Sequence, residues 1–186
     1  MAQFQVFEPN VEVLGQAVLA FLAAFPPDIK FAGEEILGRH GLINASPGDY
    51  YRVQTLLDAM KEAFDRLGNQ MMFRTGFRFA AEARAPERWS SLDDCWEGVD
   101  LAHQMNHRGG HVGKWTYTDE GSTGGLRKVK LVSASHYPCH FDLGLLEGFA
   151  KKFRPAGVVD VLIRHDDAQP CRQHGESSCT YRITWG

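Results

Sequence analysis

Cysteine and histidine side chains gather in one stretch of the chain, between His136 and Cys179. This stretch holds three of the four cysteines, Cys139, Cys171 and Cys179, and four of the eight histidines. Thiolate and imidazole are the ligands that zinc prefers, and a structural zinc site takes four such ligands in a tetrahedral arrangement. The residue types therefore favour a zinc site made by the three thiols and one further side chain.

The spacing of the cysteines supports such a site less strongly than their number does. Seven residues separate Cys171 from Cys179, whereas zinc-finger knuckles place about two to four residues between neighbouring ligands. Free cysteines also pack in protein interiors as small apolar groups. From the residues alone, two interpretations stay open: a zinc site, or three buried thiols, two of which flank a turn at Gly175.

The C-terminal third of the chain combines a cysteine, a glycine-containing helix and a later pair of cysteines. Cys139 precedes a helix that contains Gly144 and Gly148, and a short strand then leads to the element Cys171-Arg-Gln-His-Gly-Glu-Ser-Ser-Cys179. This order resembles the C-terminal part of the 4-vinyl reductase domain. The resemblance implies a fold similar to that of the NO-signalling and TRAPP-type transport superfamily, whose members bind ligands or protein partners.

The same resemblance implies which residues hold a metal. In zinc-containing relatives the matching cysteines are ligands, which here are Cys139, Cys171 and Cys179. The usual fourth ligand of those relatives is a glutamate three residues before the second cysteine, and Ala168 occupies that position in this chain. Asp167, one residue away, is therefore the expected fourth ligand. The alternatives for that place are His165, His174 and His140.

A second candidate site contains His103 and His107, which lie one helical turn apart. Such a pair can share a metal or present one imidazole to a haem or other tetrapyrrole iron. Neither a His-Glu-x-x-His nor a Cys-x-x-Cys-His motif is present. The simpler interpretation is one packed histidine and one that caps the C-terminus of a helix before Gly109.

The elements that position these residues fall into two halves of a single domain, residues 1–186. Residues 1–110 have helical periodicity, which predicts helices over 13–25, 28–40, 46–68, 71–83 and 90–107. Residues 111–186 carry the Cys/His cluster, and alternating apolar residues predict strands over 112–118, 126–135, 158–163 and 180–185. A helix over 141–153 separates the second and third of these strands. The pattern predicts an α+β fold in which a helical N-terminal half packs on a small antiparallel sheet.

Residues at the helix ends support three of these boundaries. Gly41 is expected to end the second helix in the left-handed conformation. Ser46, followed by a proline, is expected to cap the start of the third helix. Ser90 or Ser91, followed by two aspartates, is expected to cap the helix that carries His103.

Composition excludes several classes of function. The chain has 186 residues, a formal charge of -3 and no run of basic residues, so no nucleic-acid partner is expected. Its longest apolar stretch, residues 11–25, is shorter than the roughly 20 residues that cross a bilayer. No membrane span and no signal peptide are predicted, and a cytoplasmic location is expected. In that compartment the cysteines are expected as thiols or metal ligands and not as disulfides.

Three functions agree with these residues. The preferred one is a non-catalytic sensor that binds a hydrophobic small molecule, contains a structural zinc site and signals by conformational change or by homodimer formation. The first alternative is a cysteine-dependent enzyme in which Cys139 is the nucleophile and His136 or His140 the base, oriented by Asp142 or Asp167. The second alternative is a haem-based or tetrapyrrole-based gas sensor that uses His103 or His107.

Overall fold

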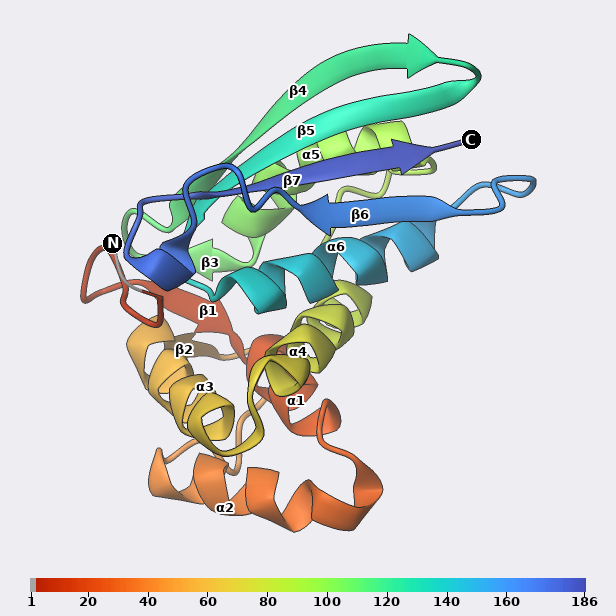
Figure 1. Cartoon of the computed structure of the whole chain (residues 1–186). Coiled ribbons are helices and arrows are strands. Elements are labelled where there is room, and N and C mark those ends of the chain that lie inside the picture. The colour runs from red at the N-terminus through yellow and green to blue at the C-terminus, as the bar shows by residue number, and fades with distance from the viewer. Residues whose placement is uncertain (1–2) are drawn as a thin grey trace.

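The computed structural model describes residues 3–186, and in Figure 1 a four-stranded sheet lies over two helices, α5 and α6, with the remaining helices below them. The α-helices of the described residues are Gly15–Ala23 (α1), Lys30–Arg39 (α2), Val53–Leu67 (α3), Asn69–Glu82 (α4), Leu92–Met105 (α5) and Cys139–Phe153 (α6). Two 3-10 helices cover Pro27–Ile29 and Arg172–His174. Helix α6 therefore contacts both the sheet side and the helical side of the molecule.

The large sheet is antiparallel, with the strand order β4-β5-β7-β6. Its strands are Gly113–Thr123 (β4), Leu126–Ser135 (β5), Val161–His165 (β6) and Cys179–Trp185 (β7). In the register of this sheet, Cys179 lies opposite Ser133, and His165 lies opposite Tyr181. The sheet thus brings the end of β6 and the start of β7 to the same edge region, where α6 begins (Figure 1).

A second, three-stranded antiparallel sheet has the order β2-β1-β3 and was not predicted. Its strands are Glu12–Leu14 (β1), Tyr50–Arg52 (β2) and His107–Arg108 (β3). Strands this short carry too few residues for a periodic pattern. Their pairing also corrects two predicted boundaries. The third helix begins at Val53 and not at Ser46, because the residues before it pair with β1, and α1 begins at Gly15 for the same reason.

Helices α4 and α6 pack closely because glycines face each other across their contact. A Cβ atom added to Gly76 would lie 1.9 Å from the carbonyl oxygen of Phe141, and one added to Gly144 would lie 1.9 Å from that of Phe73. Atoms cannot approach that closely, so neither position accepts a side chain without moving the helices apart. The glycines fix α6 against the helical half of the chain.

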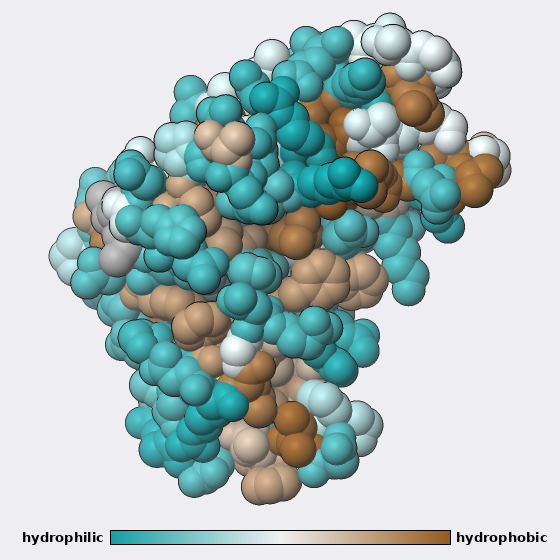
Figure 2. All heavy atoms as spheres, in the orientation of Figure 1, coloured by the Kyte–Doolittle hydropathy of each residue, from teal (hydrophilic) through white to brown (hydrophobic). Residues whose placement is uncertain are grey.

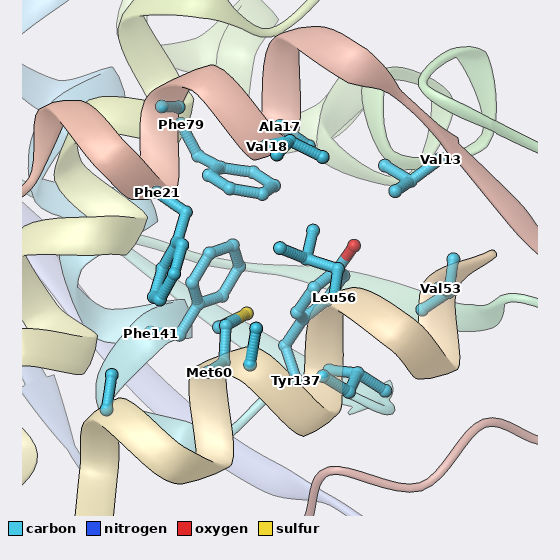
Figure 3. Close-up of a cluster of buried hydrophobic side chains, with 14 of the residues drawn as sticks. Val13, Ala17, Val18, Phe21, Val53, Leu56, Met60, Phe79, Tyr137 and Phe141 are labelled. Carbon is cyan, nitrogen blue, oxygen red and sulfur yellow. The ribbon is translucent and has the colours of Figure 1, made fainter. Parts of the chain in front are cut away.

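Two hydrophobic clusters fill the interior, one on each side of α6. The helical cluster includes Phe21, Leu56 and Phe141, whose side chains point toward one another in Figure 3. The cluster under the large sheet includes Trp96 and Phe149. Since α6 contributes to both clusters, a displacement of this helix would disturb both.

The predicted fold class is confirmed: helices dominate the N-terminal half, and the large antiparallel sheet lies in the C-terminal half. The hydroxyl of Ser91 accepts a hydrogen bond from the backbone N–H of Asp94 at the start of α5, which confirms the predicted serine cap, and the Asp94 carboxylate accepts one from the Ser91 N–H in return. Gly41 follows α2 with a φ of 69°, which confirms the predicted left-handed terminator. Helix α6 begins at Cys139, two residues before the predicted start at Phe141.

The face seen in Figure 2 is covered largely by hydrophilic side chains, and its apolar side chains form separate patches. Among the described residues, no helix has the length and apolar character that a membrane crossing demands. Homodimer formation remains a prediction.

Candidate metal centre and histidine interior

Four ligand side chains from four segments converge at one end of the large sheet. Cys139 is the first residue of α6, His165 is the last residue of β6, Cys171 lies in the β6–β7 connection, and Cys179 begins β7. The three sulfur atoms and one ring nitrogen all lie within 4.8 Å of one another. All three cysteines are buried. The structure therefore brings the three predicted thiols together with a histidine.

Local hydrogen bonds hold the two cysteine-bearing segments in place. The backbone carbonyl of Cys171 accepts a hydrogen bond from the backbone N–H of His174 at 2.9 Å, which closes a tight turn. The hydroxyl of Tyr181 donates to the carbonyl of Cys139 at 2.9 Å, so β7 is bonded directly to the start of α6. These contacts place two thiols from distant parts of the sequence at the same position in space.

His165 is oriented as a metal-ligating histidine would be. Its Nδ1 is 2.7 Å from a carboxylate oxygen of Asp167, so Nδ1 donates that hydrogen bond, and in the uncharged ring Nε2 carries the lone pair. Nε2 is buried and has no hydrogen-bond partner among the described atoms. Metal-binding histidines commonly donate their other ring N–H to a carboxylate in this way.

The predicted fourth ligand, Asp167, lies outside the group of four ligand atoms, and His165 takes that place. The side chain of Asp167 is 94% exposed and contacts His165 instead of the sulfur atoms. The reason is the strand register, which sets His165 beside Tyr181 at the end of β6 and leaves Asp167 in the turn that follows. His140 and His174 also lie outside the group and line an adjacent groove of about 550 Å³.

Arg172 lies directly against the sulfur of Cys179 and was not identified from the sequence. Its backbone N–H and its Nε each donate to Cys179 Sγ at 3.4 Å. A hydrogen bond from the Cys139 thiol, together with the charge of Arg172, lowers the pKa of Cys179. The same bond raises the pKa of Cys139, which keeps the donated proton. One thiolate is thus stabilised by the protein alone.

The guanidinium of Arg172 also connects this site to the start of α6. It forms a buried ion pair with Asp142 and donates to the carbonyls of Ser135 and Tyr137, each at 2.6 Å. Asp142 accepts a further hydrogen bond from Ser133 at 2.6 Å. Burial nevertheless raises the pKa of Asp142 to about 6. An arginine between two cysteines has no characteristic spacing, which is why sequence reasoning missed it.

His103 forms a hydrogen bond to the protein through one ring nitrogen, and His107 forms hydrogen bonds through both. His103 Nε2 is 2.8 Å from the carbonyl oxygen of Val112. His107 Nδ1 is 2.7 Å from the carbonyl oxygen of His103, and its Nε2 is 2.9 Å from the hydroxyl of Tyr137. The structure therefore shows one packed histidine and one that caps the end of α5, as the simpler interpretation predicted.

His136 lies beside this pair and is 1% exposed, yet neither of its ring nitrogens has a hydrogen-bond partner among the described atoms. Its ring centroid is 5.6 Å from that of His107. Burial lowers the pKa of His136 and that of His103, and it lowers the pKa of His107 to about 3. All three imidazoles are therefore neutral near pH 7.

A small cavity of about 40 Å³ adjoins His103 and His107. The side chains around it are mostly apolar, and the ionisable carboxyl groups among them belong to Glu82 and Asp142. No lysine or arginine belongs to its described lining. The cavity is thus much smaller than the groove beside the cysteines.

Cys139 has a predicted base, His140, beside it but does not have the lowered pKa of an activated nucleophile. Its pKa is raised, whereas a reactive thiol needs a lowered one. His140 Nδ1 is 3.5 Å from its sulfur, while the proposed orienting group Asp142 is engaged by Arg172. The geometry therefore supports a ligand role for Cys139 more than catalysis.

Comparisons with known proteins give matches only among solved structures: no family model matches, and no curated protein matches. An H-NOX protein from S. oneidensis in the Fe(II)NO ligation state has a TM-score of 0.68 and 14% identity, over 93% of this chain and 99% of that chain. A mutant H-NOX from T. tengcongensis has a TM-score of 0.56 and 14% identity, over 92% and 95%.

A third structure comes from work on haem redox potential and protein-induced porphyrin distortion, with a TM-score of 0.56 and 11% identity, over 92% of this chain and 98% of that chain. Identities this low establish the fold alone. None of the comparisons supports the 4-vinyl reductase family specifically. The chain therefore has the α+β fold of these H-NOX proteins, which agrees with the NO-signalling fold that the resemblance implied.

Proposed function

We propose that this chain is a non-catalytic sensory domain with a structural zinc site held by Cys139, His165, Cys171 and Cys179. The observation that carries this proposal is the convergence of four ligand atoms within 4.8 Å. Two sulfurs bound tetrahedrally at about 2.3 Å from zinc lie about 3.8 Å apart. The sulfurs of Cys171 and Cys179 are 3.8 Å apart. The donor set therefore fits zinc in number, chemical type and spacing.

Zinc would supply structural order at this site. Three thiolates and one divalent cation leave a net negative charge, and the N–H groups of Arg172 against Cys179 offset part of it. The ion would join the start of α6, the end of β6 and the start of β7. Structural zinc contributes on the order of 10 kcal/mol to the folding of small metal domains.

A sensory role is supported by the fold and by the connections of the site. A solved structure with this fold was determined with NO on Fe(II), so the fold accommodates small-ligand binding in that protein. Here Arg172 connects the thiols to the residues before α6, and α6 packs against α4 through glycines. A change at the thiols would move α6 and thereby reach both hydrophobic clusters.

Cobalt substitution tests the metal site. Metal is removed with a chelator and Co²⁺ is added to the full chain. We expect one cobalt per chain, with the sulfur-to-cobalt absorption and strong visible bands of a tetrahedral thiolate site. Cys171→Ser should abolish this spectrum. Cys95→Ala is the matched control, because Cys95 is the buried cysteine outside the group of four. Weak octahedral bands, or a spectrum unaffected by Cys171→Ser, would contradict the proposal.

A haem-based gas sensor is the second candidate. Two observations favour it: the haem and Fe(II)NO descriptions of the similar structures, and the position of His103 and His107 beside an interior cavity. The residues as packed do not fit a haem, because that cavity measures about 40 Å³. Pockets for drug-sized ligands measure roughly 300–1,000 Å³. The solved structures with this fold thus favour the haem candidate over the zinc site, whereas the packing of this chain's own interior favours the zinc site.

A further inference from the structure

We infer that the histidine interior of this chain is a closed, haem-independent core, although proteins with the same fold were solved with haem. This core is the space around His103, His107 and Tyr137, and its closure does not depend on zinc at the cysteines. Three properties of the space matter: what fills it, what its imidazoles bind, and which charges surround it.

Aromatic side chains occupy the space that a planar cofactor would need. The ring of Tyr137 stacks on that of Phe141, with centroids 4.5 Å apart and planes 21° apart. Phe79 meets the edge of the Phe141 ring at 4.7 Å. Figure 3 shows Phe79 and Phe141 directed into the same space between α1 and α3. The remaining cavity of about 40 Å³ is only large enough for small molecules such as water.

The two imidazoles on the cavity wall are held by bonds that iron ligation would break, and the third, His136, has unpartnered ring nitrogens but does not belong to the described lining of the cavity. His103 Nε2 is bonded to the carbonyl of Val112, and His107 Nε2 is bonded to the hydroxyl of Tyr137. Both contacts are inside the protein. Coordination through either Nε2 would leave a buried carbonyl or hydroxyl without its present partner, a cost that native interiors avoid.

The charges around the cavity are unfavourable for haem propionates. Two carboxyl groups, from Glu82 and Asp142, belong to the described lining, and no cation does. The nearest buried cation that the structure connects to this region is Arg172, whose guanidinium is already bonded to Asp142, Ser135 and Tyr137. Two further carboxylates would therefore enter a space without a free cationic partner.

The test is a titration of the full chain with ferric haem, repeated after reduction with dithionite. The readouts are the Soret band, quenching of tryptophan fluorescence and the melting temperature. Trp115 lies on the cavity wall, so a haem bound there would quench its emission. We expect no saturable Soret shift at one haem per chain, no saturable quenching and no rise in melting temperature.

The key variant is His103→Gln, since a glutamine amide can still donate to the Val112 carbonyl but provides no imidazole for iron. An equimolar Soret band that disappears in His103→Gln, His107→Gln or His136→Gln, while Cys171→Ser retains it, would overturn the inference. A band that persists in all three of these glutamine variants would place haem outside the interior and support the inference. If a variant fails to fold by circular dichroism, the wild type decides: saturable quenching together with a higher melting temperature contradicts a closed core, and their absence supports it.

Discussion

The molecule contains two buried groups of metal-binding residue types, and they are built in opposite ways. In the cysteine cluster, four ligand atoms converge within 4.8 Å, and His165 Nε2 has no partner among the described atoms. In the histidine interior, His103 and His107 are bonded to carbonyl and hydroxyl groups of the protein. The two groups therefore differ in how their ligand atoms are arranged: those of the cysteine cluster converge, whereas His103 and His107 are bonded within the protein and the unpartnered His136 belongs to no such convergent group among the described residues.

The two regions also share a connection. Arg172 contacts the sulfur of Cys179 on one side and the carbonyl of Tyr137 on the other. The hydroxyl of Tyr137 in turn contacts His107. A continuous set of contacts therefore runs from the thiols to the histidine interior, so each region can be perturbed while the other is observed.

Metal removal from the cysteine cluster should change the free energy of unfolding more than any other perturbation of the two regions. Chelation is expected to lower the free energy of unfolding of the wild type by up to the order of 10 kcal/mol, the contribution of structural zinc in small domains. Urea denaturation with and without chelator measures this change. In Cys179→Ser the two denaturation curves should coincide. Equal chelator effects in the wild type and in Cys179→Ser would show that the stabilising metal lies elsewhere.

Loss of the arginine that connects the regions should have the next largest effect. Arg172→Met leaves Asp142 buried without its cation, which is expected to cost about 3–5 kcal/mol. The double variant Arg172→Met/Asp142→Leu removes both charges and should recover much of that loss. Chemical denaturation of the wild type, both single variants and the double variant gives the interaction free energy. A double variant less stable than Arg172→Met would contradict a dominant role for the unpaired Asp142.

A substitution at Asp167 tests whether this residue orients the fourth ligand, His165, while leaving the histidine in place. Asp167→Asn should weaken zinc affinity about 10- to 100-fold, the usual effect of altering a group that positions a metal-bound histidine. Asp166→Asn is the matched control, since Asp166 pairs with Arg182 at 3.1 Å and is not a member of the group of four. Competition with a chromophoric chelator measures both affinities. Equal affinities for the two variants would show that Asp167 does not position the ligand.

The pH dependence of stability tests the histidine interior. The pKa of His136 is lower in the folded protein than in the unfolded chain, so its contribution is complete above the unfolded pKa, about 6.5. That contribution falls as the pH decreases below this value, by about 1.4 kcal/mol per pH unit for each such histidine. Asp142 acts in the opposite direction, because its pKa is raised to about 6.

A variant separates His136 from these other groups. In metal-free protein, the slope of stability against pH between about pH 6.5 and 5 should be smaller in His136→Phe than in the wild type by about 1.4 kcal/mol per pH unit. Urea denaturation at several pH values measures both slopes. Identical slopes would show that His136 is not buried as an uncharged ring.

Sequence reasoning predicted the parts of the fold that carry a local signal. The capping residues Ser91 and Asp94 and the terminator Gly41 appear where their chemistry placed them. The three-stranded sheet was missed, because strands of two or three residues are formed by pairing between distant segments. The helix expected from Ser46 therefore starts later, at Val53.

In the candidate site too, features with a local signal were predicted, and features that depend on contacts between distant segments were missed. The three cysteines were chosen by residue type, and the structure brings them together. Asp167 was chosen over His165 because the family resemblance puts the fourth ligand at the neighbouring position 168, whereas the pairing of β6 with β7 decides which side chain lies beside the sulfurs. The role of Arg172 depends on contacts with Asp142 and Cys179 that no local pattern indicates.

Zinc-edge X-ray absorption spectroscopy on the zinc-loaded full chain tests the proposed metal centre most directly. We expect a first shell of three sulfurs at about 2.3 Å and one nitrogen at about 2.0–2.1 Å. Cys171→Ser should remove one sulfur from that shell or abolish stoichiometric zinc. A shell without sulfur, or one that Cys171→Ser leaves unchanged, would contradict the assignment of zinc to Cys139, His165, Cys171 and Cys179.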